Sequence, residues 1–233
     1  MVYVTSDLHG YPLDKFKALL DKADFGADDF CFVLGDVIDR GNESIKLLKW
    51  LMLQPNFQLI RGNHEDMMLS CSFLFDEITN KSIDSLTGLD MRFYSNWVSN
   101  GGDKTLEELS AIRNKEIKYI LEYLEDTPLY ETVSVSGRDF ILTHSGLGSF
   151  SPDKKLSDYA EFDLLWTRPN FNQRYFDDII TVFGHTPTVY YGDEYKRRAI
   201  INKTWIDVDT GSSCGYDPML LRLDDLKEFY VDD

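Results

Sequence analysis

The chain has 233 residues, 43% of them apolar and 14% aromatic, so it can fill one hydrophobic core and is not of the disordered or collagen-like class. Its formal charge of −16 disfavours duplex nucleic acid and membranes as partners, because duplexes and anionic membrane surfaces bind cationic surfaces. Three scattered cysteines, no apolar leader and no apolar run of about 18 residues predict a cytoplasmic protein without disulfide bonds or membrane spans.

The first third of the chain repeats one pattern, in which a β-prone run is followed by polar residues and then by a helix. The predicted strands are residues 2–5, 30–34 and 57–60. The polar segments 6–10, 35–41 and 61–65 that follow them contain Asp7, His9, Asp36, Asp39, Arg40, Asn63 and His64. The connections are long enough for parallel crossovers, so these segments should meet at the edge where open α/β sheets bind ligands.

Residues 66–126 have a helical but irregular pattern, with a loop-like stretch at 78–89 and a helix break at Gly101 and Gly102. We expect this region to form a helical cap over the rim of the site and to influence substrate preference. No linker or internal repeat divides the chain. We therefore expect a single catalytic domain over residues 1–233, with the cap as an insertion.

After Pro128 the pattern becomes that of β-structure. A hairpin at 129–135 and 140–143 is followed by a strand at 179–183 and by short strands near 188–191, 199–202, 205–208 and 219–223. These strands predict a second, largely antiparallel sheet. His144 and His185 each follow the end of one of them.

All four histidines of the chain thus lie at or just past the end of a predicted strand. A single histidine there would be an ordinary hydrogen-bonded imidazole, but the four together indicate a metal site. The candidate ligands are Asp7, His9, Asp36, Asn63, His144 and His185. Six ligands are too many for one tetrahedral ion but suit two divalent ions if one carboxylate bridges the two ions. We choose Asp36 as the bridging carboxylate. Mixed nitrogen and oxygen donors favour manganese, iron or zinc over calcium.

The remaining polar residues have chemical tasks of their own. His64 can protonate a leaving-group oxygen while Asp39 holds its other ring nitrogen. The guanidinium of Arg40 suits two phosphoryl oxygens. Arg168 is a second candidate for substrate binding, the alternative being an exposed arginine without a role.

Taken in order, these segments resemble the motifs of the calcineurin-like metallophosphoesterases, in the phosphoprotein phosphatase branch. They are Asp7-x-His9, Gly35-Asp36-x-x-Asp39-Arg40-Gly41, Gly62-Asn63-His64-Glu65, His144-x-Gly146-Leu147 and Gly184-His185-Thr186-Pro187. The compact length is similar to bacterial and phage members, which include serine/threonine protein phosphatases and symmetrical diadenosine tetraphosphate hydrolases. The resemblance implies an α/β fold with two mixed β-sheets packed as a sandwich flanked by helices. It also implies two divalent ions, with manganese expected first, and direct attack by a metal-bridging hydroxide without a phosphoenzyme.

We therefore expect a metal-dependent hydrolase of phosphomonoesters, acting on a phosphorylated protein at phosphoserine or phosphothreonine. The alternative is a hydrolase of diadenosine tetraphosphate or another small nucleoside polyphosphate. That activity needs an aromatic and basic pocket, for which the cap residues Arg92, Phe93 and Trp97 are candidates unless they belong to the core. A binding scaffold without turnover is disfavoured, because His64 and all six candidate ligands are present.

Overall fold

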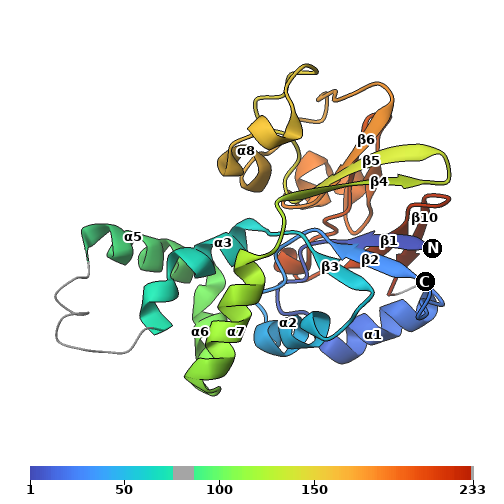
Figure 1. The fold of residues 1–233 in the computed structure, drawn as a ribbon. Coiled ribbons are helices and arrows are strands. Elements are labelled where there is room, and N and C mark those ends of the chain that lie inside the picture. Colours follow the sequence, from blue (N-terminus) through green and yellow to red (C-terminus); the bar gives the residue numbers. More distant parts are fainter. Residues whose placement is uncertain (76–86, 232–233) are drawn as a thin grey trace.

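Two five-stranded β-sheets pack face to face, with helices on their outer sides, in the computed structural model of the chain (Figure 1). The structure describes residues 1–75 and 87–231. Each sheet contains both parallel and antiparallel pairs. The predicted α/β fold with two mixed sheets is therefore confirmed.

The first sheet has the strand order β10-β9-β1-β2-β3. Its parallel strands are β1 (Val2–Thr5), β2 (Phe30–Val33) and β3 (Phe57–Leu59), which confirms the three strands predicted at the start of the chain. β9 (Met219–Arg222) and β10 (Lys227–Tyr230) extend the sheet with antiparallel pairs. All three polar segments consequently leave the same edge of this sheet.

The second sheet has the order β4-β5-β6-β8-β7. Its strands are β4 (Tyr130–Val135), β5 (Arg138–Thr143), β6 (Ile179–Phe183), β7 (Ile200–Ile201) and β8 (Trp205–Asp207). The expectation of a largely antiparallel sheet is wrong, because β5, β6 and β8 run parallel and β9 joins the first sheet. Antiparallel pairing is expected where short turns join neighbouring strands. The connection from β5 to β6 is instead long enough for the crossover that parallel strands need. The strand predicted at 188–191 is instead a 3-10 helix.

Helices cover the outer side of the first sheet. α1 (Leu13–Lys22) and α2 (Ser44–Met52) lie beneath this sheet in Figure 1. Both are amphipathic, and α1 buries Leu13, Phe16, Leu19 and Leu20 in the same apolar cluster as α2. The short α8 (Glu161–Leu165) belongs to the connection between β5 and β6.

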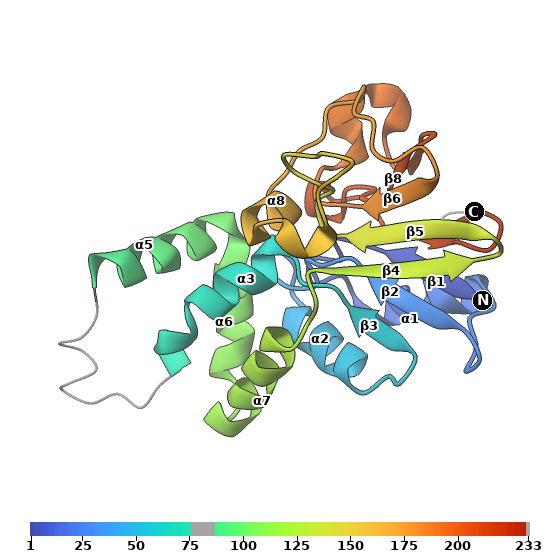
Figure 2. The ribbon, with the colours of Figure 1, turned by 45° about the horizontal axis from the view of Figure 1, so that its top comes forward.

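The cap region is helical, as predicted, in its described part. Its helices α3 (Asn63–Ser70), α5 (Gly88–Trp97), α6 (Asp103–Ser110) and α7 (Asn114–Glu125) gather on one side of the sandwich in both views (Figures 1 and 2). A π-helical turn, η2 (Val98–Gly102), joins α5 to α6 at the predicted glycine break. Residues 76–86, with most of the loop expected at 78–89, lie outside the described residues.

Short 3-10 helices complete the described structure. They are η1 (Ser72–Phe75), η3 (Leu156–Asp158), η4 (Thr188–Tyr191), η5 (Asp193–Tyr195) and η6 (Ser212–Cys214). Within the two described ranges, none of the helices has the length and apolar character needed to span a bilayer.

An apolar layer between the two sheets holds the sandwich together. It includes the buried side chains of Val4, Phe32, Leu34, Phe140, Leu142, Val182, Ile206 and Leu221. Full burial of a side chain of this size contributes about 1.5–3 kcal/mol, so the layer fixes the two sheets against each other. The loops after β1, β2, β5 and β6 are thereby brought to a common edge.

Candidate metal centre and active site

The candidate site lies where loops from both sheets meet. Asp7 and His9 follow β1, Asp36 follows β2, and Asn63 and His64 begin α3 after β3. The second sheet contributes two residues that follow β5 and β6, which are His144 and His185. The structure thus brings together all six side chains that the sequence predicts as metal ligands, and all six are buried.

Much of the backbone at this edge has an unusual conformation. Of the eleven non-glycine residues with positive φ in the described chain, six belong to the predicted site: Asp7, His9, Asp36, Asp39, Arg40 and His185. Left-handed backbone is costly for side-chain-bearing residues and persists where the surroundings determine it, often at functional sites. The clustering therefore supports a functional role for this edge.

Hydrogen bonds between the loops stabilise this backbone. The amides of Asp7 and His9 donate to the carbonyls of Gly35 and Asp36 at 3.0 and 2.8 Å. The buried Glu65 carboxylate accepts from the amides of Asp36 and Val37, both at 2.8 Å. Glu65 thus ties the second polar segment to the third. No task for Glu65 is predicted from the sequence, although it directly follows His64 in the third motif.

His144 presents a lone pair to the centre of the cluster. Its Nδ1 lies 2.8 Å from the carbonyl oxygen of Leu34, which can only accept, so in the neutral ring the proton is on Nδ1 and the lone pair on Nε2. Nε2 faces Asn63 Oδ1 at 2.8 Å, His185 Nδ1 at 3.1 Å and Asp36 Oδ1 at 3.5 Å. Electron-pair donors converge here, as a cation site requires.

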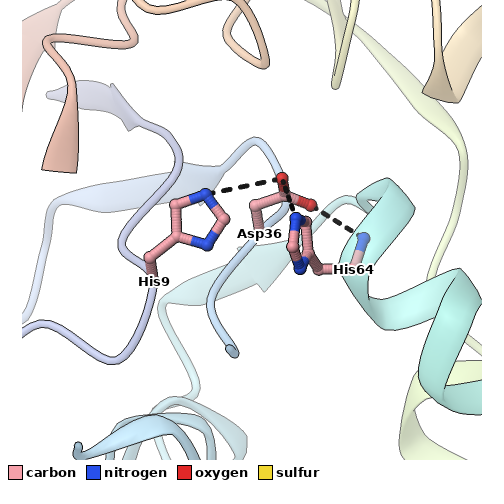
Figure 3. Close-up of side chains that lie close together, drawn as sticks. All are labelled: His9, Asp36 and His64. Atoms are coloured by element: carbon pink, nitrogen blue, oxygen red, sulfur yellow. Dashed lines mark hydrogen bonds and ion pairs between the residues drawn. The ribbon is translucent and has the colours of Figure 1, made fainter. Parts of the chain in front are cut away.

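A second set of donors lies beside the first. Figure 3 shows His9 and His64 directed toward the carboxylate of Asp36. The Nε2 atoms of His9 and His64 are 3.7 and 3.8 Å from Asp36 Oδ2. Nε2 of His9 is also 3.8 Å from Asp7 Oδ1, while its Nδ1 lies 3.1 Å from the Ile38 carbonyl oxygen. The two oxygens of Asp36 therefore face different groups of ligand atoms.

Two groups of ligand atoms in the described chain are compact enough to hold a metal ion. One consists of His9, Asp36 and His64, and the other of Asp36, His144 and His185, with ligand atoms within 4.8 Å of one another in each. Asp36 belongs to both, as a bridging carboxylate would. The first group contains His64, which the sequence predicts as an acid, and leaves out Asp7. His64 differs from the other members in that its Nε2 accepts a hydrogen bond from Arg40 Nη2 at 3.1 Å.

The electrostatics also fit bound cations. Burial raises the pKa of Asp36 well above its usual range, and the neighbouring Asp7 and Glu65 carboxylates raise it further. Burial raises the pKa of Asp7 as well, and it lowers the pKa of His185 far below its usual value. In addition, His185 Nε2 is buried without a hydrogen-bond partner. Divalent cations would favour ionised carboxylates and neutral imidazoles at this site, so the residues present fit two such ions.

His64 and Asp39 form a tight pair next to the ligand cluster. His64 Nδ1 lies 2.6 Å from Asp39 Oδ2, and both side chains are buried. Burial raises the pKa of Asp39 to about 7. Burial also lowers the pKa of His64, and the nearby Arg40 guanidinium lowers it further. The geometry is that of an imidazole held in one orientation by a carboxylate.

A polar pocket opens over the cluster. Its lining includes the predicted substrate-binding residues Arg40 and Arg168, both exposed. Arg168 Nη1 donates to the carbonyl oxygen of His185 at 3.2 Å and to Thr186 Oγ1 at 3.3 Å. The remaining lining residues are Asp7, His9, Asp36, Asn63, His64, Asn100, Trp166, His185, Pro187, Tyr190 and Ser213. Two cationic forks beside the donor cluster can bind an anionic phosphoryl group.

The pocket also contains aromatic residues that sequence reasoning missed. Tyr190 is 68% exposed, and the half-buried ring of Trp166 packs edge-on against His185 with centroids 6.2 Å apart. The candidates named from the sequence lie elsewhere. Trp97 is completely buried, and neither Arg92 nor Phe93 lines the pocket. The one sequence signal for the aromatic residues Trp166 and Tyr190 is that Trp166 lies two positions before Arg168, a predicted substrate-binding residue.

Comparison with known sequences identifies a family. A sequence model described as calcineurin-like phosphoesterase matches residues 1–209. The chain is also 23% identical over 197 residues to a symmetrical bis(5'-nucleosyl)-tetraphosphatase of Chromobacterium violaceum. That match covers 82% of this chain but 58% of the relative, so the chain spans little more than half of the relative's length.

Comparison with solved structures shows a shared fold. A protein described as a candidate diadenosine tetraphosphatase is 16% identical with a TM-score of 0.62, over 97% of this chain and 90% of that one. A cold-active protein-tyrosine phosphatase of a psychrophilic Shewanella species is 17% identical with a TM-score of 0.59, over 99% and 78% of the two chains. At these identities the likeness concerns the fold alone.

Proposed function

This chain belongs to the calcineurin-like phosphoesterase family, and on that premise we propose that it hydrolyses symmetrical dinucleoside tetraphosphates. The observation that carries the proposal is a buried donor cluster for two cations under a pocket with two arginines and two aromatic rings. The name of the Chromobacterium violaceum relative, which is similar over 82% of this chain, supports this choice of substrate. The order expected from the sequence, with phosphoproteins first, is thereby reversed.

The proposed reaction is a single displacement. The oxygen of a water molecule attacks the second phosphorus of the tetraphosphate chain, and the bond from that phosphorus to the bridging oxygen shared with the third breaks. One nucleoside diphosphate leaves with the bridging oxygen, which takes up a proton, and the other keeps the attacking oxygen. For a symmetrical dinucleotide the two products are identical. The cations would neutralise phosphoryl charge and activate the water for in-line attack.

The chain's own residues bind the substrate and handle the proton. Arg40 and Arg168 clamp phosphoryl oxygens with their guanidinium groups. In the protonated ring of His64, Nδ1 donates to Asp39, and Nε2, which faces the pocket, gives its proton to the departing oxygen. The cations would be held by Asp7, His9, Asp36, Asn63, His144 and His185, Asp36 would serve both, and manganese is the metal to try first.

Tyr190 and Trp166 distinguish a dinucleotide from a simple phosphate ester. Stacking of a base on an aromatic side chain is worth about 1–3 kcal/mol, roughly 5- to 150-fold in binding. Both rings lie in the same pocket as Arg168, so a base can stack there while its phosphates reach the arginine. A phosphopeptide has no base to place on them.

The test compares two substrates on one preparation. The 233-residue protein, stripped by chelation and reloaded with Mn²⁺, is given diadenosine tetraphosphate or a phosphothreonine peptide. We expect faster hydrolysis of the dinucleotide, with ADP as the sole nucleotide product. Preference for the peptide, or formation of ATP and AMP, would refute the proposal.

A matched pair of variants tests the aromatic contact. Tyr190→Ala should raise KM for the dinucleotide by about tenfold, because the stacking surface is lost, and should leave KM for an aryl phosphate unchanged. Tyr119→Ala, at a 53% exposed position of α7 outside the pocket, should change neither value. Equal KM values for Tyr190→Ala and Tyr119→Ala would remove Tyr190 from substrate binding.

A further inference from the structure

The turn between α5 and α6 reaches from the cap to the active-site loop after β2. We call residues 97–105 the cap turn, and we propose that it is a positioning element that holds Asp39 and Arg40 and thereby orients His64. This inference rests on the proposed hydrolysis of phosphoesters. It gives the cap a task in the chemistry in addition to covering the rim.

The cap turn holds the Asp39 carboxylate from two sides. Trp97 Nε1 donates to Asp39 Oδ2 at 2.9 Å, the same oxygen that lies 2.6 Å from His64 Nδ1. Thr105 Oγ1 donates to Asp39 Oδ1 at 2.5 Å and accepts from the Asp39 amide at 3.0 Å. Trp97, Thr105 and Asp39 are all completely buried. The carboxylate therefore cannot rotate without breaking bonds that no water can replace.

The same turn also holds Arg40. The Arg40 amide donates to the carbonyl oxygen of Gly101 at 3.0 Å, and its Nε donates to that of Asn100 at 3.3 Å. The far end of the guanidinium reaches His64 Nε2 at 3.1 Å. With the backbone and Nε fixed, Nη2 is held next to His64 and the Arg40 side chain lines the pocket. The cap turn thus sets the direction of the phosphoryl-binding fork.

These contacts explain how an unusual backbone is maintained. Asp39 and Arg40 have φ values of 73° and 66°, so two consecutive residues with side chains are left-handed. Such residues persist only where their surroundings over-determine them. Both of their amides donate to the cap turn, at Thr105 and Gly101.

Glycine is needed in the cap turn for close approach. Gly101 has a φ of 99°, and a Cβ there would lie 2.7 Å from Arg40 Cγ. A Cβ on Gly102 would lie 2.5 Å from the Trp97 ring. The glycine pair therefore allows the turn to pack directly on Arg40 and on the Trp97 indole.

A further contact ties α6 to the segment that follows Arg40. Both carboxylate oxygens of Glu108 accept from the start of α2, from the Ser44 amide at 2.7 Å and the Ile45 amide at 3.0 Å. The loop between β2 and α2 is thus held by the cap at its centre and at its end. A shift of α6 would move Asp39 and Arg40 with it.

Two tryptophan variants separate positioning from stability. Trp97 and Trp205 are both completely buried, and each Nε1 makes one hydrogen bond of 2.9 Å. Trp205, in β8, donates to the carbonyl oxygen of Gln173, which lies in the connection from α8 to β6. Trp97→Phe should lower kcat for an alkyl phosphate by at least about tenfold, with KM and the rate for an aryl phosphate nearly unchanged, because only the poorer leaving group depends on the acid. Trp205→Phe should leave the ratio of the two rates at the wild-type value.

A second pair of variants tests Arg40. Gly101 and Gly137 both have positive φ, but nothing lies within 4 Å of a Cβ on Gly137, in the β4–β5 turn. Gly101→Ala should weaken binding of inorganic phosphate to the metal-loaded protein by about tenfold, the value of a charge-assisted contact. Gly137→Ala introduces backbone strain at a positive φ without a steric clash, so this variant should bind phosphate like the wild type.

A readout without turnover keeps the inference testable by itself. The proton between His64 Nδ1 and Asp39 Oδ2 should give a low-field NMR signal, which should shift in Trp97→Phe and stay in place in Trp205→Phe. The inference would be overturned if Trp97→Phe and Trp205→Phe changed the rate ratio and the NMR signal equally, and if Gly101→Ala and Gly137→Ala changed phosphate binding equally. If the wild type hydrolyses no phosphoester, the proposed function fails, while the signal and phosphate binding still decide the role of the cap turn.

Discussion

Replacing His64 by asparagine distinguishes an acid from a metal ligand. His64 has one ring nitrogen 2.6 Å from Asp39 and the other 3.8 Å from Asp36 Oδ2, so both roles are within geometric reach. The sequence predicts that His64 is the acid, whereas its position within the group of His9, Asp36 and His64 makes it a possible metal ligand. An asparagine amide does not supply a proton, and the substitution therefore removes acid catalysis.

The expected size of the effect depends on the leaving group. A positioned general acid contributes about 10²- to 10⁴-fold, which corresponds to about 2.7–5.5 kcal/mol in the activation free energy. His64 is buried and held by Asp39, so little of this contribution is lost to disorder. We expect kcat to fall by at least about a hundredfold for an alkyl phosphate and by less than about tenfold for an aryl phosphate, whose leaving group needs no proton.

The assay combines steady-state kinetics on these two esters with elemental analysis of metal content. His64→Asn should retain two ions per chain, and Asp39→Asn should show the same leaving-group dependence in weaker form. Loss of one ion in His64→Asn would make His64 a ligand. An equal fall in kcat for both esters would likewise refute the acid role.

Two further predictions concern buried carboxylates. Asp36→Asn should abolish binding of both ions, as measured by elemental analysis. Asp7→Asn, in contrast, should leave the group of Asp36, His144 and His185 intact. If Asp36→Asn retained one ion, Asp36 would not be shared between the two ions. Burial raises the pKa of Asp207 well above its usual range, and its Oδ2 has no hydrogen-bond partner. The folded state keeps this proton where the unfolded state has lost it, so the stability due to Asp207 is present below about pH 4 and is lost as the pH rises toward the folded-state pKa. Urea unfolding without metal measures the free energy of unfolding of Asp207→Asn and of the wild type. The value for the variant minus that for the wild type should increase from pH 5 to pH 8. A difference that stayed constant would contradict the raised pKa of Asp207.

The part of the fold that the sequence predicts well is local in origin. Buried strands such as Phe30–Val33 are continuous apolar runs, and the polar residues after them stand out without knowledge of their neighbours. Parallel connections then place Asp7, Asp36 and Asn63 at one edge, which is where the structure has them. The direction of β6 and β8 was not predictable in this way, because it depends on how a long connection crosses the sheet.

The sequence by itself determined which side chains gather at the candidate site, because residue type and position at a strand end are properties of short segments. Only the tertiary structure decided what surrounds them. Trp97 and Thr105 contact Asp39 across 58 and 66 residues of chain, and Trp97 proved to be a buried donor instead of part of a base pocket. Trp166 and Tyr190 line one pocket although 24 residues of chain separate them. Such contacts follow from the packing of whole helices and sheets, and no local pattern of residues encodes that packing.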